Sequence, residues 1–162
     1  MADEKSIQDW LIDEGMLKER ITDEQANFHY TIAYPNDNIM DLIQPKGKND
    51  MIVIGCATHV SPEHTEMIRN LSMDKKIELI WKFKYTINGF LLDFQVEHPD
   101  NILQLFVITS TIYADGLSKN ALIGEIKKIF KVKLQCLLEM DRILGQTVSS
   151  TPSKPDDHAM FQ

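Results

Sequence analysis

A cysteine and two histidines lie close together in the sequence and come nearest to a metal-binding cluster. Zinc sites use such side chains, at paired spacings that bring four ligands to one ion. Cys56 and His59 are an odd number of residues apart in a segment with strand character, so they point to opposite faces of a sheet. His64 follows on the next helix, and a fourth ligand would have to come from a distant segment. We therefore predict no metal site and interpret Cys56 as a small buried hydrophobic residue.

Acid–base chemistry would require carboxylates placed close to a histidine or to each other. Asp93 and Glu97 alternate with Phe94 and Val96 along one predicted strand, so both acids share its solvent-facing side. The sequence contains no nucleophile-elbow, P-loop or dinucleotide-binding glycine pattern. These observations favour a protein that is not an enzyme, with no catalytic residues and no cofactor.

The composition is that of an ordinary globular protein with a negative net charge. The 162-residue chain is 43% hydrophobic and 25% charged, and its net charge is −7. This charge opposes nonspecific attraction to nucleic acid and to anionic lipid. Two cysteines are too few for a disulfide scaffold, and no apolar run reaches the ~20 residues of a membrane span. We expect a cytoplasmic protein with no signal peptide and no membrane partner.

Five segments alternate apolar with polar residues and are predicted to be strands: 27–34, 39–44, 51–59, 90–96 and 102–113. In the first of them Phe28, Tyr30 and Ile32 fall on one face. The third, 51–59, is more apolar than the first and is expected to be central. The turns between neighbouring strands are short and rich in turn-forming residues, which predicts antiparallel pairing.

Four helices are predicted from apolar spacing and from capping residues: 7–14, 62–71, 73–87 and 119–144. Ser6, Ser61, Ser72 and Ser118 stand immediately before these helices or at their first turn, where serine caps the backbone N–H groups. The first helix ends near residue 14 or extends to Leu17.

These elements predict an α+β domain with the order α-βββ-αα-ββ-α. We expect one antiparallel five-stranded sheet with helices packed mainly on one face. A chain of this length buries enough surface to fold without a metal or a disulfide. The domain should cover residues 1–145, and residues 146–162, rich in Ser, Thr, Pro and Asp, should form a disordered C-terminal tail.

Two of the predicted helices, 73–87 and 119–144, carry wider apolar arcs than one sheet face can cover. A surface helix normally buries a stripe a little over ~100° wide. The surplus predicts either packing of the two helices on each other within one chain or an interface with another chain. The candidate partner or dimer surface consists of six apolar residues: Leu79, Phe83, Ile87, Val132, Leu138 and Ile143. Two-fold homodimers are the commonest symmetric oligomers, so a homodimer is expected.

The last predicted helix carries more basic than acidic residues. A basic helix face can contact RNA or an acidic partner, but this one lacks the interleaved exposed aromatic residues on which bases stack. We interpret it as a solvated face, and nucleic acid is not an expected partner.

The opening segment 7–11 (IQDWL) and the strand segment 28–30 (FHY) resemble a small prokaryotic, largely archaeal, family of unknown function. The order of elements also resembles the type III secretion chaperone-like fold, which is shared with the YbjN-like proteins. The resemblance covers about residues 5–145. It implies a small acidic homodimer that binds extended client segments, and it implies no catalytic residue.

The sequence therefore favours a non-enzymatic protein-binding or chaperone-like module with a protein or peptide client. The alternative is a small-ligand-binding protein or an undetected enzyme with a pocket between the sheet and the helices. Four aromatic residues are candidates to line such a pocket: Tyr30, Tyr34, Trp81 and Tyr113. Aromatic residues also dominate ordinary cores, so this reading competes with simple packing.

Overall fold

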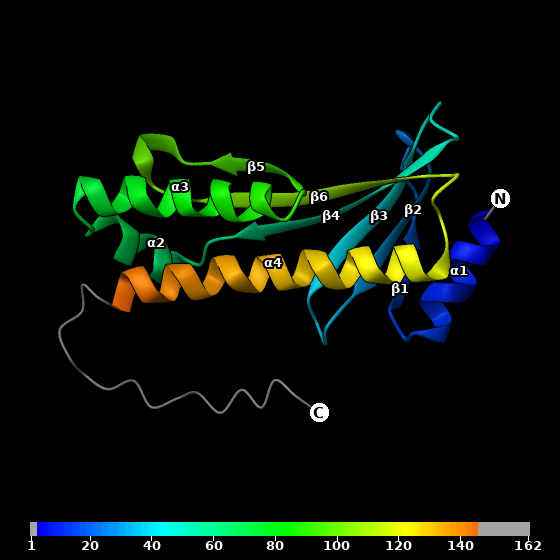
Figure 1. Cartoon of the computed structure of the whole chain (residues 1–162), viewed down its shortest axis with the longest axis horizontal. Helices are drawn as coiled ribbons and strands as arrows, with labels where there is room; N and C mark the ends of the chain where they lie inside the picture. Colours follow the sequence, from blue (N-terminus) through cyan, green and yellow to red (C-terminus); the bar gives the residue numbers. More distant parts are fainter. Residues whose placement is uncertain (1–2, 146–162) are drawn as a thin grey trace.

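The structure, a computed structural model, describes residues 3–145 of the chain (Figure 1). Four α-helices lie within this range: α1 (Glu4–Asp13), α2 (Pro62–Arg69), α3 (Met73–Gly89) and α4 (Lys119–Gly145). Six strands accompany them: β1 (Leu17–Ile21), β2 (Ala26–Ala33), β3 (Ile39–Pro45), β4 (Met51–His59), β5 (Asp93–Glu97) and β6 (Leu105–Tyr113). A short 3-10 helix, η1 (Pro99–Asn101), precedes β6. The predicted disordered tail, residues 146–162, lies outside the described residues.

The six strands form one antiparallel sheet in the order β1-β2-β3-β4-β6-β5. This confirms the predicted α+β class and the antiparallel pairing, and it places β4 inside the sheet as expected. Figure 1 shows α4 running along the sheet, with α3 and α2 near one end of the elongated body and α1 at the other.

The predicted number of five strands is wrong because it lacks β1. This strand lies at the edge of the sheet, and its three middle residues are exposed. A register shift between Leu17 and Glu19 also interrupts its pairing with β2. An exposed, charged edge strand lacks the alternation by which strands are recognised. The extension of the first helix to Leu17 is wrong too, because α1 ends at Asp13 and Gly15, with a φ of 64°, turns the chain into β1.

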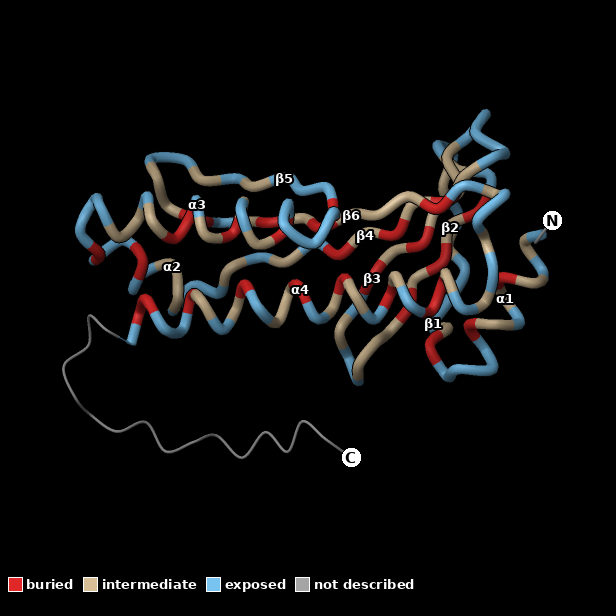
Figure 2. Tube along the Cα trace, viewed as in Figure 1, coloured by how far each residue is buried: buried red, intermediate tan, exposed pale blue. Residues whose placement is uncertain are grey.

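The buried side chains of the inner strands lie on the sheet face that the helices cover. On β2 they are Phe28, Tyr30 and Ile32, as the alternation predicts. Figure 2 shows the same alternation along the inner strands and buried positions repeating along α4. The buried residues form one continuous cluster that includes members from α1 to the end of α4. A single hydrophobic core therefore holds both ends of the elongated body together.

Side-chain caps fix where the helices begin. Ser61, Ser72 and Ser118 each accept a hydrogen bond from the backbone N–H three residues later, at 3.2, 3.3 and 3.1 Å. These bonds confirm the predicted starts of α2, α3 and α4. The cap of α1 is Asp3 and not the predicted Ser6, because the Asp3 carboxylate accepts hydrogen bonds from the backbone N–H and the hydroxyl of Ser6, both at 2.8 Å.

Two strands begin later than predicted. β5 begins at Asp93 and not at residue 90, because α3 continues to Gly89 and the chain then turns through Phe90 and Leu91. β6 begins at Leu105 and not at residue 102, because η1 occupies the preceding connection. Three large apolar residues after α3 are thereby left outside the regular elements: Leu92 is buried, whereas Phe90 and Leu91 are exposed.

Candidate functional site

The six residues predicted to form a partner surface do not form one. Leu79, Phe83, Ile87 and Ile143 are fully buried, and Val132 is 1% exposed. These five belong to the core because α3 and α4 pack on each other and on the sheet. Only Leu138 remains at the surface. The prediction is therefore corrected for the five buried residues, which cannot reach another chain while the domain is folded.

The four aromatic residues predicted to line a pocket do not converge either. Tyr30 is buried, and its hydroxyl donates to Glu4 at 2.7 Å. Tyr34 is half-buried against the edge of the Phe130 ring, with 5.9 Å between ring centroids. Trp81 and Tyr113 are exposed, on α3 and on the end of β6 respectively.

The outward side of α3 carries a continuous apolar row that we call the α3 stripe: Met73, Ile77, Trp81 and Tyr85. All four residues are exposed, and Tyr85 reaches 70% exposure. A spacing of four residues places them one above another on the helix surface. The Trp81 and Tyr85 rings pack together with 5.6 Å between centroids, and the Lys84 ammonium lies 5.1 Å from the Trp81 ring centroid.

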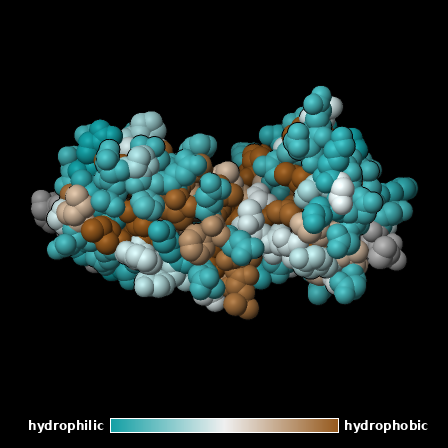
Figure 3. Space-filling view, turned by 90° about the horizontal axis from the view of Figure 1, so that it is seen from above, coloured by the Kyte–Doolittle hydropathy of each residue, from teal (hydrophilic) through white to brown (hydrophobic). Residues whose placement is uncertain are grey.

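The connection from α3 to β5 carries two further exposed apolar residues. Phe90 is exposed, and Leu91 is 90% exposed with a φ of 58°. A left-handed backbone is unfavourable for a residue with a Cβ atom. Because Leu91 is exposed, its side chain also gains none of the free energy that burial of a leucine would provide. Figure 3 shows an apolar knob that protrudes over this connection. We call the α3 stripe together with Phe90 and Leu91 the α3–β5 surface.

Charged residues flank the α3 stripe on both sides of Trp81. Asp74, Lys75, Lys76 and Glu78 precede it, and Lys82 and Lys84 follow it. A hydrogen bond from Lys75, at 3.0 Å, lowers the pKa of Glu78 below its usual value. Glu78 is therefore a carboxylate at neutral pH, and it lies one helical turn before Lys82 on the same flank of the stripe.

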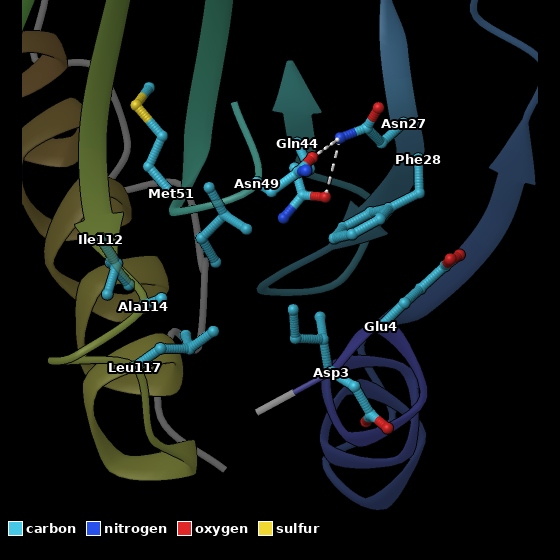
Figure 4. Close-up of a pocket in the computed structure, with 12 residues that line it drawn as sticks. Asp3, Glu4, Asn27, Phe28, Gln44, Asn49, Met51, Ile112, Ala114 and Leu117 are labelled. Carbon is cyan, nitrogen blue, oxygen red and sulfur yellow. Dashed lines mark hydrogen bonds between the residues drawn. The ribbon is translucent and has the colours of Figure 1, made fainter. Parts of the chain in front are cut away.

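A cavity of about 440 Å³ lies at the other end of the sheet, near the start of α1 (Figure 4). Its apolar walls come from the ends of β2, β4 and β6, from α1 and from the connection after β6: Ile7, Phe28, Met51, Ile52, Ile112, Ala114 and Leu117. Three amide side chains line another side: Asn27, Gln44 and Asn49. The Asn27 amide nitrogen donates to Gln44 Oε1 at 3.0 Å and to Asn49 Oδ1 at 2.8 Å.

Two acidic residues at the start of α1 complete the lining of the cavity. A backbone hydrogen bond from Ser6 lowers the pKa of Asp3. Burial alone would raise the pKa of Glu4, but hydrogen bonds from Arg20 and Tyr30 bring it below its usual value. Both side chains are therefore ionised at neutral pH.

The three residues considered and rejected as metal ligands lie on β4 and α2. Cys56 is 1% exposed, which confirms its interpretation as a buried residue, and burial raises the pKa of its thiol. His59 is exposed at the end of β4, and His64 lies on α2. Within residues 3–145, no group of three or more His, Cys, Asp or Glu side chains is arranged to hold a metal ion.

The sheet face away from the helices carries a charged clip around His29, which the sequence did not single out. Its Nδ1 lies 2.9 Å from Asp23 Oδ2, and its Nε2 lies 2.7 Å from Asp41 Oδ1. Burial alone would lower the pKa of His29, but the hydrogen bonds to Asp41 and Asp23 raise it above its ordinary value. Both ring nitrogens donate when the ring is protonated. The clip therefore joins the β1–β2 turn to β3 through a cation between two carboxylates.

No helix in the described part of the chain is both long and apolar enough to cross a membrane.

Known proteins similar to this chain give a family and a fold. The profile of a family described as uncharacterized conserved protein (DUF2299) matches residues 3–140. The crystal structure of an uncharacterized protein from Methanothermobacter thermautotrophicus is 48% identical, with a TM-score of 0.85, over 88% of this chain and 99% of that chain. YbjN from E. coli has a TM-score of 0.54 and 11% identity, over 87% of this chain and 92% of YbjN, which shows the fold alone. No curated protein matches the chain. These findings confirm the resemblance to a family of unknown function with an archaeal neighbour and a YbjN-like fold.

The His29 clip generates a prediction about pH. Because the folded-state pKa is raised, its stabilisation is complete below the ordinary histidine pKa of about 6.5 and is lost as pH rises through the folded-state pKa. We expect the difference in unfolding free energy between the wild type and His29→Gln to shrink from pH 6 to pH 9. Urea unfolding at each pH measures this difference. A pH-independent difference for His29→Gln would contradict the clip.

Proposed function

Because the chain belongs to the DUF2299 family of uncharacterized conserved proteins, its function has to be inferred from its own surface, and we propose that it is a non-enzymatic protein-binding module that forms a homodimer. The observation that carries this proposal is the α3–β5 surface, which combines four exposed apolar residues of α3 with Leu91, 90% exposed in a left-handed backbone conformation. Contiguous exposed apolar side chains rimmed by polar residues mark sites of protein contact. Tryptophan and tyrosine are also the residues most enriched at the energetic centres of interfaces.

Glu78 and Lys82, one helical turn apart on one flank of the α3 stripe, support a second copy of the chain as the partner. In a two-fold dimer the same surface contacts itself, and two α3 helices that face each other run antiparallel when the axis crosses them near Trp81. This arrangement brings Glu78 of one copy towards Lys82 of the other, twice in each dimer. It also places Ile77 of one copy near Tyr85 of the other, so apolar residues meet apolar residues. The stripe is thus complementary to itself in charge and in hydrophobicity.

Replacing the central aromatic residue tests the interface. We expect Trp81→Ala to raise the dimer dissociation constant at least roughly thirtyfold, because a central interface aromatic contributes about 2 kcal/mol or more. Size-exclusion chromatography with light scattering over a concentration series measures this constant. Tyr113→Ala is the matched control, since Tyr113 is an exposed aromatic residue on β6, outside the α3–β5 surface. A wild-type chain that stays monomeric at millimolar concentration, or equal effects of both variants, would overturn the homodimer.

Charge reversal distinguishes a second copy from an unrelated partner. We expect Glu78→Lys and Lys82→Glu each to weaken the dimer. Each single change places like charges opposite one another in both of the symmetry-related contacts between the two helices. The double variant should recover most of the lost affinity, since it restores opposite charges with their positions exchanged. The same light-scattering titration compares all four proteins. A double variant no tighter than the weaker single variant would exclude the antiparallel α3 pairing.

Leu91 provides a test in which stability and association change in opposite directions. Leu91→Gly should stabilise the folded monomer by about 0.5–1 kcal/mol, because glycine relieves the left-handed backbone and only part of that gain is offset by its unfolded-state entropy. The same change should weaken the dimer by removing an apolar contact. Urea unfolding in the Trp81→Ala background measures monomer stability without the contribution of association. Loss of monomer stability in Leu91→Gly would show that the Leu91 side chain serves the fold of the single chain.

A further inference from the structure

We propose that the cavity at the α1 end of the sheet binds a neutral, largely apolar small molecule that presents an amide-type carbonyl oxygen. The proposal does not rest on the homodimer, because the cavity and the α3–β5 surface share no residue. Its volume of about 440 Å³ lies within the range of about 300–1,000 Å³ that is usual for small-molecule pockets.

The apolar walls of the cavity continue the hydrophobic core. Ile7, Phe28, Ile52 and Ile112 belong to the core cluster and also line the cavity. All four are buried within this cluster, which holds them in place, so these walls need no rearrangement to receive a ligand. Figure 4 shows the Phe28 ring projecting from β2 towards the interior of the cavity. A flat apolar group can therefore contact an aromatic ring on one side and aliphatic side chains on the other.

The amide cluster supplies hydrogen-bond donors in a fixed orientation. The register of β2 against β3 shifts between Ala26 and Phe28, so Asn27 occupies an irregular position in the strand. Such bulges redirect a side chain, and here the Asn27 amide nitrogen bonds the side-chain oxygens of Gln44 and Asn49. With both oxygens engaged, the Gln44 and Asn49 amino groups have no protein partner within residues 3–145. Two donors at an apolar cavity select a ligand that carries an acceptor oxygen.

The acidic residues select against anionic ligands. Asp3 and Glu4 put negative charge at the rim, which repels a carboxylate or a phosphate. One oxygen of each carboxylate already accepts hydrogen bonds: Asp3 Oδ1 from Ser6, and Glu4 Oε1 from Arg20 and Tyr30. Figure 4 shows the Asp3 carboxylate directed away from the amide cluster. An ammonium group carries no acceptor for the amide donors of that cluster. A neutral ligand with a carbonyl group pairs with these donors and avoids the repulsion from the acids.

Three compounds that share a naphthyl group test the charge of the ligand and its acceptor oxygen separately: 1-naphthylacetamide, 1-naphthylacetate and 2-(1-naphthyl)ethylamine. We expect the full chain to bind the amide at least tenfold more tightly than either charged compound, as measured by isothermal titration calorimetry. The proposal is overturned if the amide does not bind at millimolar concentration. It is equally overturned if the amine or the carboxylate binds as tightly as the amide.

Variants locate the binding in the cavity. Gln44→Leu should weaken amide binding roughly two- to tenfold, which is the effect of losing one hydrogen bond, while Gln104→Leu, at an exposed glutamine outside the cavity, should leave it unchanged. Ala114→Phe should abolish binding, because the ring fills the space between β6 and the connection to α4. Circular dichroism and light scattering show whether each variant keeps the fold and the oligomeric state of the wild type. Unchanged amide affinity in both Gln44→Leu and Ala114→Phe would place the ligand elsewhere and refute the assignment.

Discussion

The packing of α3 on the sheet and against α4 determines which residues this protein can present to a partner. Phe83 meets Phe106 of β6 edge to face, with 4.9 Å between ring centroids and an interplanar angle of 82°. Leu79 and Ile87 are fully buried on the same side, which fixes the rotation of α3 about its axis. Because successive helical residues are ~100° apart, Trp81 and Tyr85 must then face solvent. α3 is apolar on most of its circumference. Half of its large apolar residues therefore stay exposed to solvent in the single chain.

Periodicity predicted the elements of this region but could not predict the direction in which α3 faces. Leu79 and Trp81 belong to the same wide apolar arc, and an arc of that width gives no preferred inward direction. The residue types on this arc do indicate which side of α3 faces the solvent. Tryptophan and tyrosine carry a polar group and are less often fully buried than leucine, isoleucine and phenylalanine, so Trp81 and Tyr85 were the better surface candidates.

The strand faces and three of the helix caps were predictable because the determining interactions are local. Phe28 and Ile32 alternate with polar residues, and Ser72 caps a backbone N–H three residues away. The cavity was not predictable, because its lining comes from α1, from four strands or their turns, and from the connection after β6. The left-handed backbone at Leu91 gave no signal either, because such a turn is normally identified by glycine or asparagine.

The two proposed sites lie at opposite ends of one rigid sheet and need not influence each other. Phe106, which orients α3, and Ile112, which lines the cavity, are both on β6 and lie roughly 20 Å apart at ~3.3 Å per residue. Between them β6 is paired with β4 on one side, residue by residue, from Met51 to His59. Energetic coupling over such a distance requires an element with two discrete arrangements, and a strand paired with β4 along its whole length offers none. Occupancy of the cavity should therefore leave dimerisation unchanged, and each site can be judged on its own measurements.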